Sequence, residues 1–314
     1  MKKRHKPIDE TLTLTIHDLS HEGAGVGKNA EGKTVFVRGA LPHETVVARL
    51  TKKRKDYDEA VCESVITASP DRVMPPCAHF GVCGGCSLQH LSPAAQIRFK
   101  HEQLVQNLQR IAKVTPQQWL APLTGPTTGY RRKARLGAKY VVPKERVLVG
   151  FREADKPYVA DLRRCEVISP AIGHKLEALA ALLQGLSVRD KIPQIEVAQA
   201  DNRLALVLRN LAPVSDDDAK ALQAWAQTND LDFYLQPGNE STIVPLTAGA
   251  PALYYGLESI TKQALTIEFL PADFVQINAD INRDMLTQAL QWLNVKSSDR
   301  VLELFAGLGN FTLP

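Results

Sequence analysis

The chain has 314 residues, of which 44% are hydrophobic, and a formal net charge of +4 at pH 7. This length allows two or three domains, and no apolar run reaches the roughly 18 residues of a membrane-spanning helix. No apolar stretch follows the basic start at residues 1–7, which argues against a secretory signal. The five cysteines are odd in number and lack disulfide-scaffold spacing, so we expect a cytoplasmic protein with ligand cysteines and no membrane contact.

The first 66 residues have the pattern of a small β unit. Gly23, Gly25 and Gly27 mark the first turn, and short strands with turns at this spacing predict a small barrel. The segments with strand character are residues 11–16, 34–37, 45–50 and 60–66. Lys53 and Arg54 belong to a cationic run between two of these strands. Such a hairpin tip suits phosphate contacts, and a solubilising loop is the other interpretation.

A loop rich in proline and glycine, residues 67–93, holds three cysteines in the spacing C-x5-C-x2-C. They are Cys77, Cys83 and Cys86. A fourth ligand must come from elsewhere in the chain, and Cys165 is the natural candidate. Four thiolates hold either tetrahedral zinc or an iron–sulfur cluster, and the spacing by itself favours zinc.

Positive charge gathers after this loop. Residues 94–165 contain 15 Lys or Arg and 5 Asp or Glu, whereas residues 166–314 contain 10 and 18. The basic block is either a surface for a polyanion such as RNA or a solvated face. Within it we expect a helix at about 93–111, with Ser92 as its N-cap.

Residues 120–272 form a mixed region, followed by a last helix at about 279–294 and a strand at 300–305. In the mixed region we expect a strand at 203–208 and helices near 174–186 and 215–229. Asn278 is the expected cap of the last helix. Its expected buried stripe is Ile281, Met285 and Ala289.

The strand at 300–305 leads into a turn with Gly307 and Gly309, where glycine lets the backbone approach a ligand closely. Glu303 within the strand and Thr312 at the third glycine position favour S-adenosylmethionine over a nicotinamide cofactor. Gln276 could bridge a cofactor and a base through its amide, or it could be a loop residue facing water.

Five motifs together resemble the RNA uracil-5-methyltransferases, in particular the bacterial ribosomal RNA members that carry a TRAM domain, an OB-like RNA-binding barrel. The motifs are HEGAGVG at 21–27, C-x5-C-G-G-C, GYRRK at 129–133, DFVQIN at 273–278 and LFAGLGNFTLP at 304–314. The resemblance covers essentially the whole chain. It implies a TRAM-like β-barrel at 1–66, a central α+β domain with an iron–sulfur loop at 67–272, and the beginning of a Rossmann-like α/β methyltransferase domain at 273–314.

The resemblance also implies the ligands. It implies a [4Fe–4S] cluster on Cys77, Cys83, Cys86 and Cys165, which replaces the zinc interpretation. It implies S-adenosylmethionine at Gln276, Phe305, Gly307 and Asn310, and 23S ribosomal RNA as the partner of a monomeric enzyme. The expected RNA contacts are Lys53, Arg54, Arg131, Arg132, Lys133 and Arg135. Arg131, Lys133 and Arg135 would share one face of a strand, and a plain solvated face is the alternative.

Methylation at uracil C5 needs a thiolate that adds at C6 and a base that removes the C5 proton. No cysteine follows Gly307, and Cys62 lies in a strand pattern typical of a buried small hydrophobe. We therefore expect the nucleophile and the base to lie beyond Pro314, and the 314 residues alone not to methylate. The alternative function is an RNA-binding module with a structural four-cysteine metal site and no catalysis.

Overall fold

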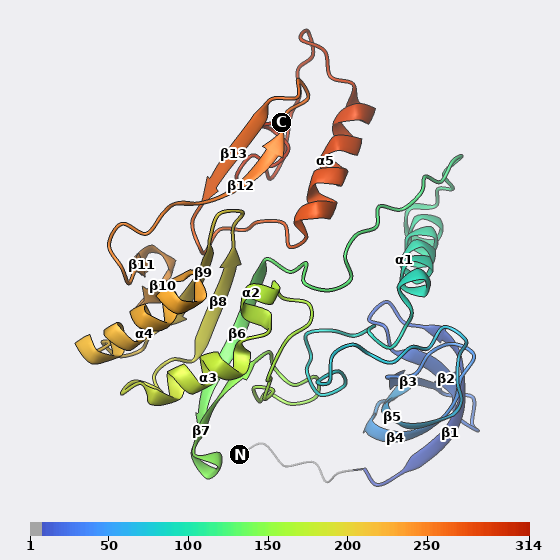
Figure 1. Cartoon of the computed structure of the whole chain (residues 1–314). Helices are drawn as coiled ribbons and strands as arrows, with labels where there is room; N and C mark the ends of the chain where they lie inside the picture. The colour runs from blue at the N-terminus through green and yellow to red at the C-terminus, as the bar shows by residue number, and fades with distance from the viewer. Residues whose placement is uncertain (1–7) are drawn as a thin grey trace. The chain divides into compact units, whose positions relative to one another are not determined.

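The computed structural model describes residues 8–314, so the basic start at residues 1–7 lies outside the described part (Figure 1). The chain divides into two compact units, Met1–Pro122 and Leu123–Pro314, and each has its own sheet. The domain limits expected at residues 66 and 272 stay predictions. No helix within residues 8–314 is long and apolar enough to span a bilayer.

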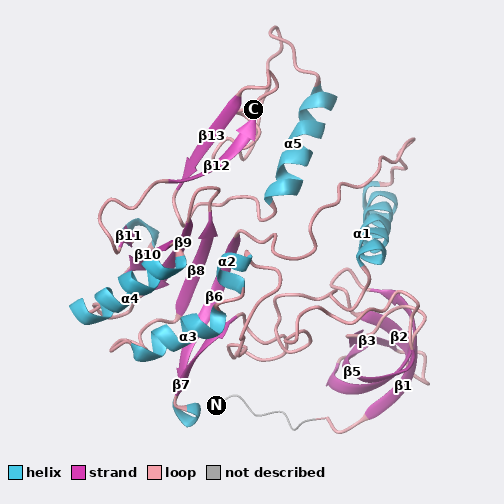
Figure 2. Ribbon diagram, viewed as in Figure 1, coloured by secondary structure: helices cyan, strands magenta, loops and turns pink. Residues whose placement is uncertain are grey.

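The N-terminal unit begins with a closed five-stranded barrel in the order β1-β2-β3-β5-β4, which confirms the expected small barrel (Figure 2). The strands are β1 (Thr11–Leu19), β2 (Gly25–Lys28), β3 (Thr34–Arg38), β4 (Thr45–Lys53) and β5 (Tyr57–Thr67). Alternate residues of each strand face inward, and the buried core includes Leu14, Ile16, Val35, Val37, Val46, Ala48 and Leu50. Strands β3 and β5 pair in parallel, and the other neighbouring strands pair antiparallel.

Gly25 shows why the first turn needs glycine. A Cβ atom there would lie 2.9 Å from both the carbonyl oxygen of Ala40 and Cγ2 of Ile16, closer than real Cβ contacts allow. Gly23 has a φ of +84°, the left-handed region that favours glycine. The turn glycines therefore close the barrel by permitting both tight packing and a backbone conformation that other residues rarely adopt.

A buried ion pair joins the barrel to the segment that follows it. The side chain of Glu44 is fully buried, and the Arg72 guanidinium donates to both of its carboxylate oxygens, with Nη2 2.8 Å from Oε2. The backbone N–H groups of Leu41 and Ser69 donate to the same carboxylate. Burial would raise the pKa of Glu44, but these donors outweigh it and the pKa is lowered.

After an irregular segment, helix α1 (Pro93–Asn107) begins where it was predicted. The Ser92 hydroxyl accepts from the backbone N–H of Ala95 at 3.3 Å, and Pro93 occupies the first turn. A single π-helical turn, Leu108–Ala112, continues it until Lys113 turns to a φ of +57°. Apolar side chains of α1 and the preceding loop, among them Leu91, Ala95 and Phe99, pack on Leu19 and Leu41 of the barrel region.

The C-terminal unit is built on a six-stranded sheet in the order β11-β10-β9-β8-β6-β7, in which only β9 and β10 run parallel. Its strands are β6 (Lys133–Val141), β7 (Arg146–Gly150), β8 (Gln194–Gln199), β9 (Leu204–Arg209), β10 (Leu231–Gln236) and β11 (Val244–Pro245). Its helices are α2 (Pro170–Gly173), α3 (Leu176–Gly185) and α4 (Asp216–Asn229), and short 3₁₀ turns are at Val142–Lys144 and Glu240–Thr242. Helices α3 and α4 contact each other and cover one face of the sheet (Figure 1). The strand and helices expected in this region are therefore confirmed.

A hairpin and a helix complete this unit. The hairpin consists of β12 (Leu253–Glu258) and β13 (Ala264–Phe269), and α5 (Ala279–Leu293) follows it. One apolar core joins the sheet, the hairpin and the helix, with Val207, Tyr234, Tyr255, Phe269 and Leu286 among its members. The residues of α5 that are buried are Asn282 and Leu286, whereas the expected stripe of Ile281, Met285 and Ala289 is half-buried. The helix is thus rotated by one residue from the expected phase.

The strand expected at 300–305 is not formed. This segment is irregular in the structure, and the side chains of Val301, Leu302, Leu304 and Phe305 are exposed. A buried parallel strand needs hydrogen-bonded neighbours, and no strand within residues 8–314 pairs with this segment.

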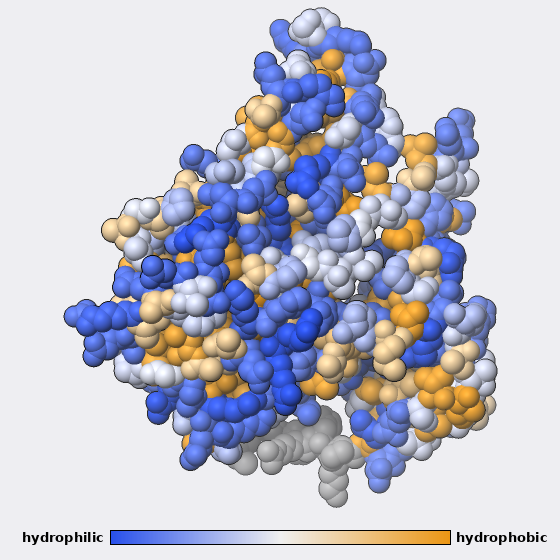
Figure 3. Space-filling model, viewed as in Figure 1, coloured by the Kyte–Doolittle hydropathy of each residue, from blue (hydrophilic) through white to orange (hydrophobic). Residues whose placement is uncertain are grey.

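The space-filling view shows hydrophobic and hydrophilic residues intermixed over the visible surface (Figure 3).

Candidate functional site

Two of the sequence motifs lie side by side in the C-terminal unit. The backbone N–H of Arg132 donates to the carbonyl of Ile277 at 2.9 Å, and Arg131 forms a bridge with Asn278. Asn278 also caps α5 as expected, since its side-chain oxygen accepts from Ile281 N–H at 3.2 Å. The GYRRK and DFVQIN segments therefore meet at the N-terminus of α5.

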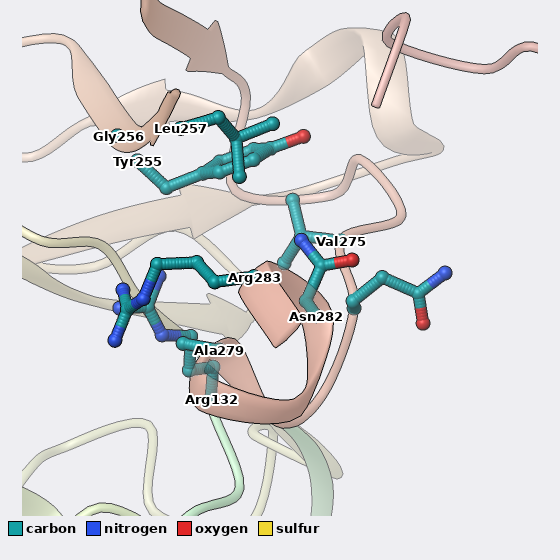
Figure 4. Close-up of a pocket in the computed structure, with 9 residues that line it drawn as sticks. Arg132, Tyr255, Gly256, Leu257, Val275, Ala279, Asn282 and Arg283 are labelled. Carbon is teal, nitrogen blue, oxygen red and sulfur yellow. The ribbon is translucent and has the colours of Figure 1, made fainter. Parts of the chain in front are cut away.

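A small pocket opens at this meeting point, between β12, the DFVQIN loop and α5 (Figure 4). It is lined by Arg132, Tyr255, Gly256, Leu257, Val275, Gln276, Ala279, Asn282 and Arg283. Arg132 pairs with Asp201, whose other carboxylate oxygen accepts from the backbone N–H of Gly256 at 2.8 Å. The arginine at the pocket is therefore held by an ion pair that is itself tied to the hairpin.

The expected cofactor residues fall into two groups. Gln276 lines the pocket, and Asn310 exchanges hydrogen bonds with Asn282, which lines the same pocket. Gly307 has a φ of +57°, whereas Phe305 has a φ of +60° and a fully exposed side chain. The structure thus connects Gln276 with Asn310 and leaves the Phe305 side chain away from the pocket.

Sequence reasoning missed Asn282 and Tyr255. Asn282 is 5% exposed and Tyr255 is 7% exposed. The one available signal was the i, i+4 spacing of Asn278, Asn282 and Leu286 along one face of the helix. A polar residue on the buried face of an amphipathic helix indicates a specific partner, because an unpaired buried amide is costly.

The cations expected to contact RNA already have protein partners. Arg131 lies over the Phe151 ring at 5.9 Å from its centroid, and Lys133 Nζ donates to the carbonyl of Pro271. Burial is the main cause that lowers the pKa of Lys133. The exposed Arg135 pairs with Glu196 at 2.8 Å. Of these three residues, Arg135 has the side chain most accessible to a phosphate.

The barrel cations are accessible but also paired. Lys53 Nζ lies 2.6 Å from Glu10, and this contact is the main cause that raises the pKa of Lys53. Arg54 Nε lies 3.4 Å from Glu59. Both basic side chains are more than half exposed, so a phosphate could compete for them.

The cysteine loop has an ordered backbone. The N–H of Cys83 donates to the carbonyl of His79 at 2.9 Å, and the N–H of Gly85 donates to Cys83 Sγ at 3.4 Å. The three cysteines of the loop are half-buried, and Cys165, in the C-terminal unit, is buried. No group of three or more His, Cys, Asp or Glu side chains within the described chain is arranged to hold a metal ion.

His90 is a polar residue of this loop whose ring nitrogens have no hydrogen-bond partner within the described chain. Its ring is 1% exposed and packs on the Phe80 ring at 5.1 Å between centroids. Burial, and then Arg72, lowers the pKa of His90 to about 4, so the ring is neutral with an unpaired N–H. His90 lies four residues after Cys86 in the chain, and a buried donor without a protein partner in a cysteine-containing loop fits an inorganic centre with sulfur acceptors.

Comparisons with known proteins agree with the resemblance. The TRAM domain family matches residues 8–61, and the tRNA (Uracil-5-)-methyltransferase family matches residues 94–314. Proteins described as 23S rRNA (uracil(1939)-C(5))-methyltransferase are 46% identical in Alcanivorax borkumensis and 47% identical in Xanthomonas campestris. The alignments cover 100% of this chain and 70% and 71% of those proteins.

A solved structure shares the fold. It is the Pyrococcus abyssi tRNA (uracil-54, C5)-methyltransferase in complex with S-adenosyl-L-homocysteine, with a TM-score of 0.66 and 18% identity over 96% of this chain and 69% of that one. At this identity the likeness concerns the fold alone. With the family match over residues 94–314 and whole-chain identity near one half, the chain belongs to the RNA uracil-5-methyltransferase family.

Proposed function

We propose that the protein takes part in S-adenosylmethionine-dependent methylation at C5 of one uridine in 23S ribosomal RNA. The observation that carries this proposal is identity of 46% and 47%, across the whole chain, to enzymes described with that activity. The chain spans about 70% of the length of those enzymes. The proposal assigns RNA binding and part of the cofactor site to the described residues.

The RNA side of the proposal rests on two features. The barrel matches a TRAM domain, and its exposed Lys53 and Arg54 lie at the end of β4 and just after it. The exposed Arg135 lies on β6 within the basic block. Exposed cations of this kind neutralise phosphates and release counterions, which supplies affinity without reading sequence.

The cofactor would supply an electrophilic methyl group on a sulfonium. Gln276 offers an amide that both donates and accepts, at the pocket beside α5. Gly307 and Gly309, both with positive φ, allow the main chain of the turn to approach a bound ligand closely. The two elements are linked through Asn282, which lines the pocket and bonds to Asn310.

The thiolate for uracil C6 does not come from the described cysteines in this proposal. Burial raises the pKa of Cys62, which lies on the barrel strand β5, so its thiol stays protonated at neutral pH. We assign Cys77, Cys83, Cys86 and Cys165 to a [4Fe–4S] cluster. We therefore assign none of the five cysteines of this sequence as the nucleophile at uracil C6.

The cluster assignment rests on the donor set, on the Gly85 N–H directed at Cys83 Sγ and on the unpaired His90. Anaerobically purified protein should contain about four iron and four sulfide per chain and absorb broadly in the visible range. Cys165→Ser should lose this iron, whereas the control Cys62→Ser should keep it. A colourless protein with one zinc per chain would replace the cluster by a structural zinc site.

RNA and cofactor binding test the function. Unmodified 23S rRNA fragments that contain the target uridine should bind at least about tenfold more tightly than 16S fragments of equal length at the same salt concentration. Calorimetry should detect S-adenosylmethionine binding. Equal affinity for both RNAs together with no cofactor binding would contradict the proposal. Methyl transfer to uridine by the 314 residues alone, detected by mass spectrometry, would contradict the assignment of the nucleophile.

A further inference from the structure

Two asparagine side chains form a closed pair between α5 and the glycine turn. Asn282 Nδ2 donates to Asn310 Oδ1 at 2.9 Å, and Asn310 Nδ2 donates to Asn282 Oδ1 at 2.9 Å. Asn282 is 5% exposed and is the buried polar residue of α5. One N–H and the oxygen of each amide are therefore matched in a partly buried environment, where a lost partner is costly.

Tyr255 adds a third contact to the same pair. Its hydroxyl donates to Asn310 Oδ1 at 3.3 Å from the hairpin strand β12. Burial is the main cause that raises the pKa of Tyr255, so the phenol keeps its proton and stays a donor at neutral pH. Figure 4 shows Tyr255 above Asn282 on the side of the pocket formed by the hairpin. Asn310 Oδ1 thus accepts from Tyr255 on β12 and from Asn282 on α5, and Asn310 Nδ2 donates back to Asn282.

Apolar contacts fix the same turn on either side of Asn310. Leu308 and Phe311 pack against the core that contains Tyr255 and Leu286. Gly309 N–H donates to the carbonyl of Ala306 at 2.9 Å, which closes the turn on itself. The side chains of the turn therefore face the protein, and its glycine backbone is the part available to a ligand.

We propose that Asn282 is a positioning residue, which holds the Gly307–Asn310 turn through the Asn310 side chain so that the turn meets S-adenosylmethionine with its main chain. This inference rests on the proposed function of the turn as part of the cofactor site. In it, the Asn310 side chain anchors the turn to α5 through the amide pair. Asn282 couples the turn to the pocket at Gln276, since it belongs to both.

The test compares cofactor affinity and fold stability in the same variants of the whole chain, with S-adenosylmethionine as the probe. Asn282→Ala removes one half of the pair and leaves the half-buried amide of Asn310 without this partner, so we expect about tenfold weaker binding. Asn310→Ala should weaken binding to the same extent. The double variant should be no weaker than either single variant, because both remove one interaction.

Two further variants separate positioning from general damage. Tyr255→Phe removes a single 3.3 Å hydrogen bond and should weaken binding by about two- to threefold, with little risk to the fold. Asn229→Ala removes a half-buried amide on α4, whose Nδ2 donates to the Trp225 carbonyl at 2.8 Å. It is the matched control, and its affinity for S-adenosylmethionine should equal that of the parent chain.

The outcomes distinguish this inference from the proposed function. If the parent chain shows no detectable S-adenosylmethionine binding, the proposed cofactor role of the turn is wrong, and the inference that depends on it is wrong as well. A parent chain that binds, with an Asn282→Ala variant that melts at a lower temperature but binds equally well below its melting transition, would overturn the inference alone. Additive losses in the double variant would likewise overturn it, since Asn282 and Asn310 would then act separately.

Discussion

The barrel strands and residues 301–305 start from the same kind of sequence, short runs of aliphatic and β-branched residues, yet they end in opposite states. In the barrel, Ile16 and Leu50 are at most 1% exposed. In the C-terminal segment, Leu302 is 83% exposed and Leu304 is 70% exposed. The barrel strands pair with one another within residues 11–67, whereas no strand within residues 8–314 pairs with residues 301–305.

The difference shows that an apolar pattern specifies a strand only when a partner edge is present. Strand β1 pairs with both β2 and β4, so its backbone groups are satisfied on both edges. Residues 301–305 pair with no strand of the part of the chain that the structure describes, and most of their side chains are exposed. Substitutions in the two regions should therefore have very different effects on the free energy of unfolding.

The largest loss of stability should come from the buried ion pair between Glu44 and Arg72, which joins the barrel to the segment after it. Glu44→Ala leaves the Arg72 guanidinium without its buried partner, so we expect a loss of about 3–5 kcal/mol in the stability of the N-terminal unit. Urea unfolding monitored by hydrogen exchange of residues 11–67 measures this loss. The matched control is Glu63→Ala, which breaks an exposed pair with Arg49 and should cost less than about 1 kcal/mol. Equal losses would mean that burial is not what makes the first pair important.

A core truncation should have the next largest effect. Ile16→Ala leaves a cavity among side chains that are fully buried in the barrel, and we expect a loss of about 2–5 kcal/mol. The same urea measurement applies. A loss below about 1 kcal/mol would show that the barrel can repack around the missing methyl groups, which would weaken the contrast between the two regions.

Acid should destabilise the N-terminal unit through His90. The pKa of His90 is lowered from 6.5 in a free side chain to about 4, first by burial and then by Arg72. Between these pH values the unfolded chain binds more protons than the folded chain, so stability falls as the pH falls from 6.5 to 4. The total loss should be up to about 3 kcal/mol.

His90→Phe should flatten this dependence on pH, because the ring that takes up the proton is gone. Unfolding at pH 7, 5.5 and 4.5 gives the slope for both proteins. Glu44 also has a lowered pKa, so its stabilisation is complete above about pH 4.5 and is lost at lower pH. An unchanged slope in the His90→Phe variant would place the responsible group elsewhere.

The smallest effect should come from the exposed segment. Leu302→Ala removes a side chain that makes little contact with the protein, so the stability should change by no more than about 0.5 kcal/mol. Urea unfolding with hydrogen exchange of the C-terminal unit measures it. A loss as large as that of Ile16→Ala would show that residues 301–305 are packed in solution.

Sequence patterns that extend over only a few residues were sufficient to predict much of the fold. Alternation of apolar residues predicted the barrel, and the caps Ser92 and Asn278 predicted where α1 and α5 begin. Such features depend on hydrogen bonds and side chains only a few residues apart. For the candidate site, the motifs predicted Gln276 and the glycine turn as cofactor contacts, which stays a prediction, but they did not indicate the protein contacts of these residues.

The amino-acid sequence alone was enough to predict the barrel, the approximate limits of the helices of the chain and the family. These features depend on hydrogen bonds between residues close in sequence and on the spacing of motifs. Tertiary structure decided the partner of Asn282, which is 28 residues away in the chain, and the partners of Arg131 and Lys133. It also decided that residues 301–305 form no strand. Each of these depends on which distant groups are brought within a few ångströms, and sequence separation carries no information about that distance.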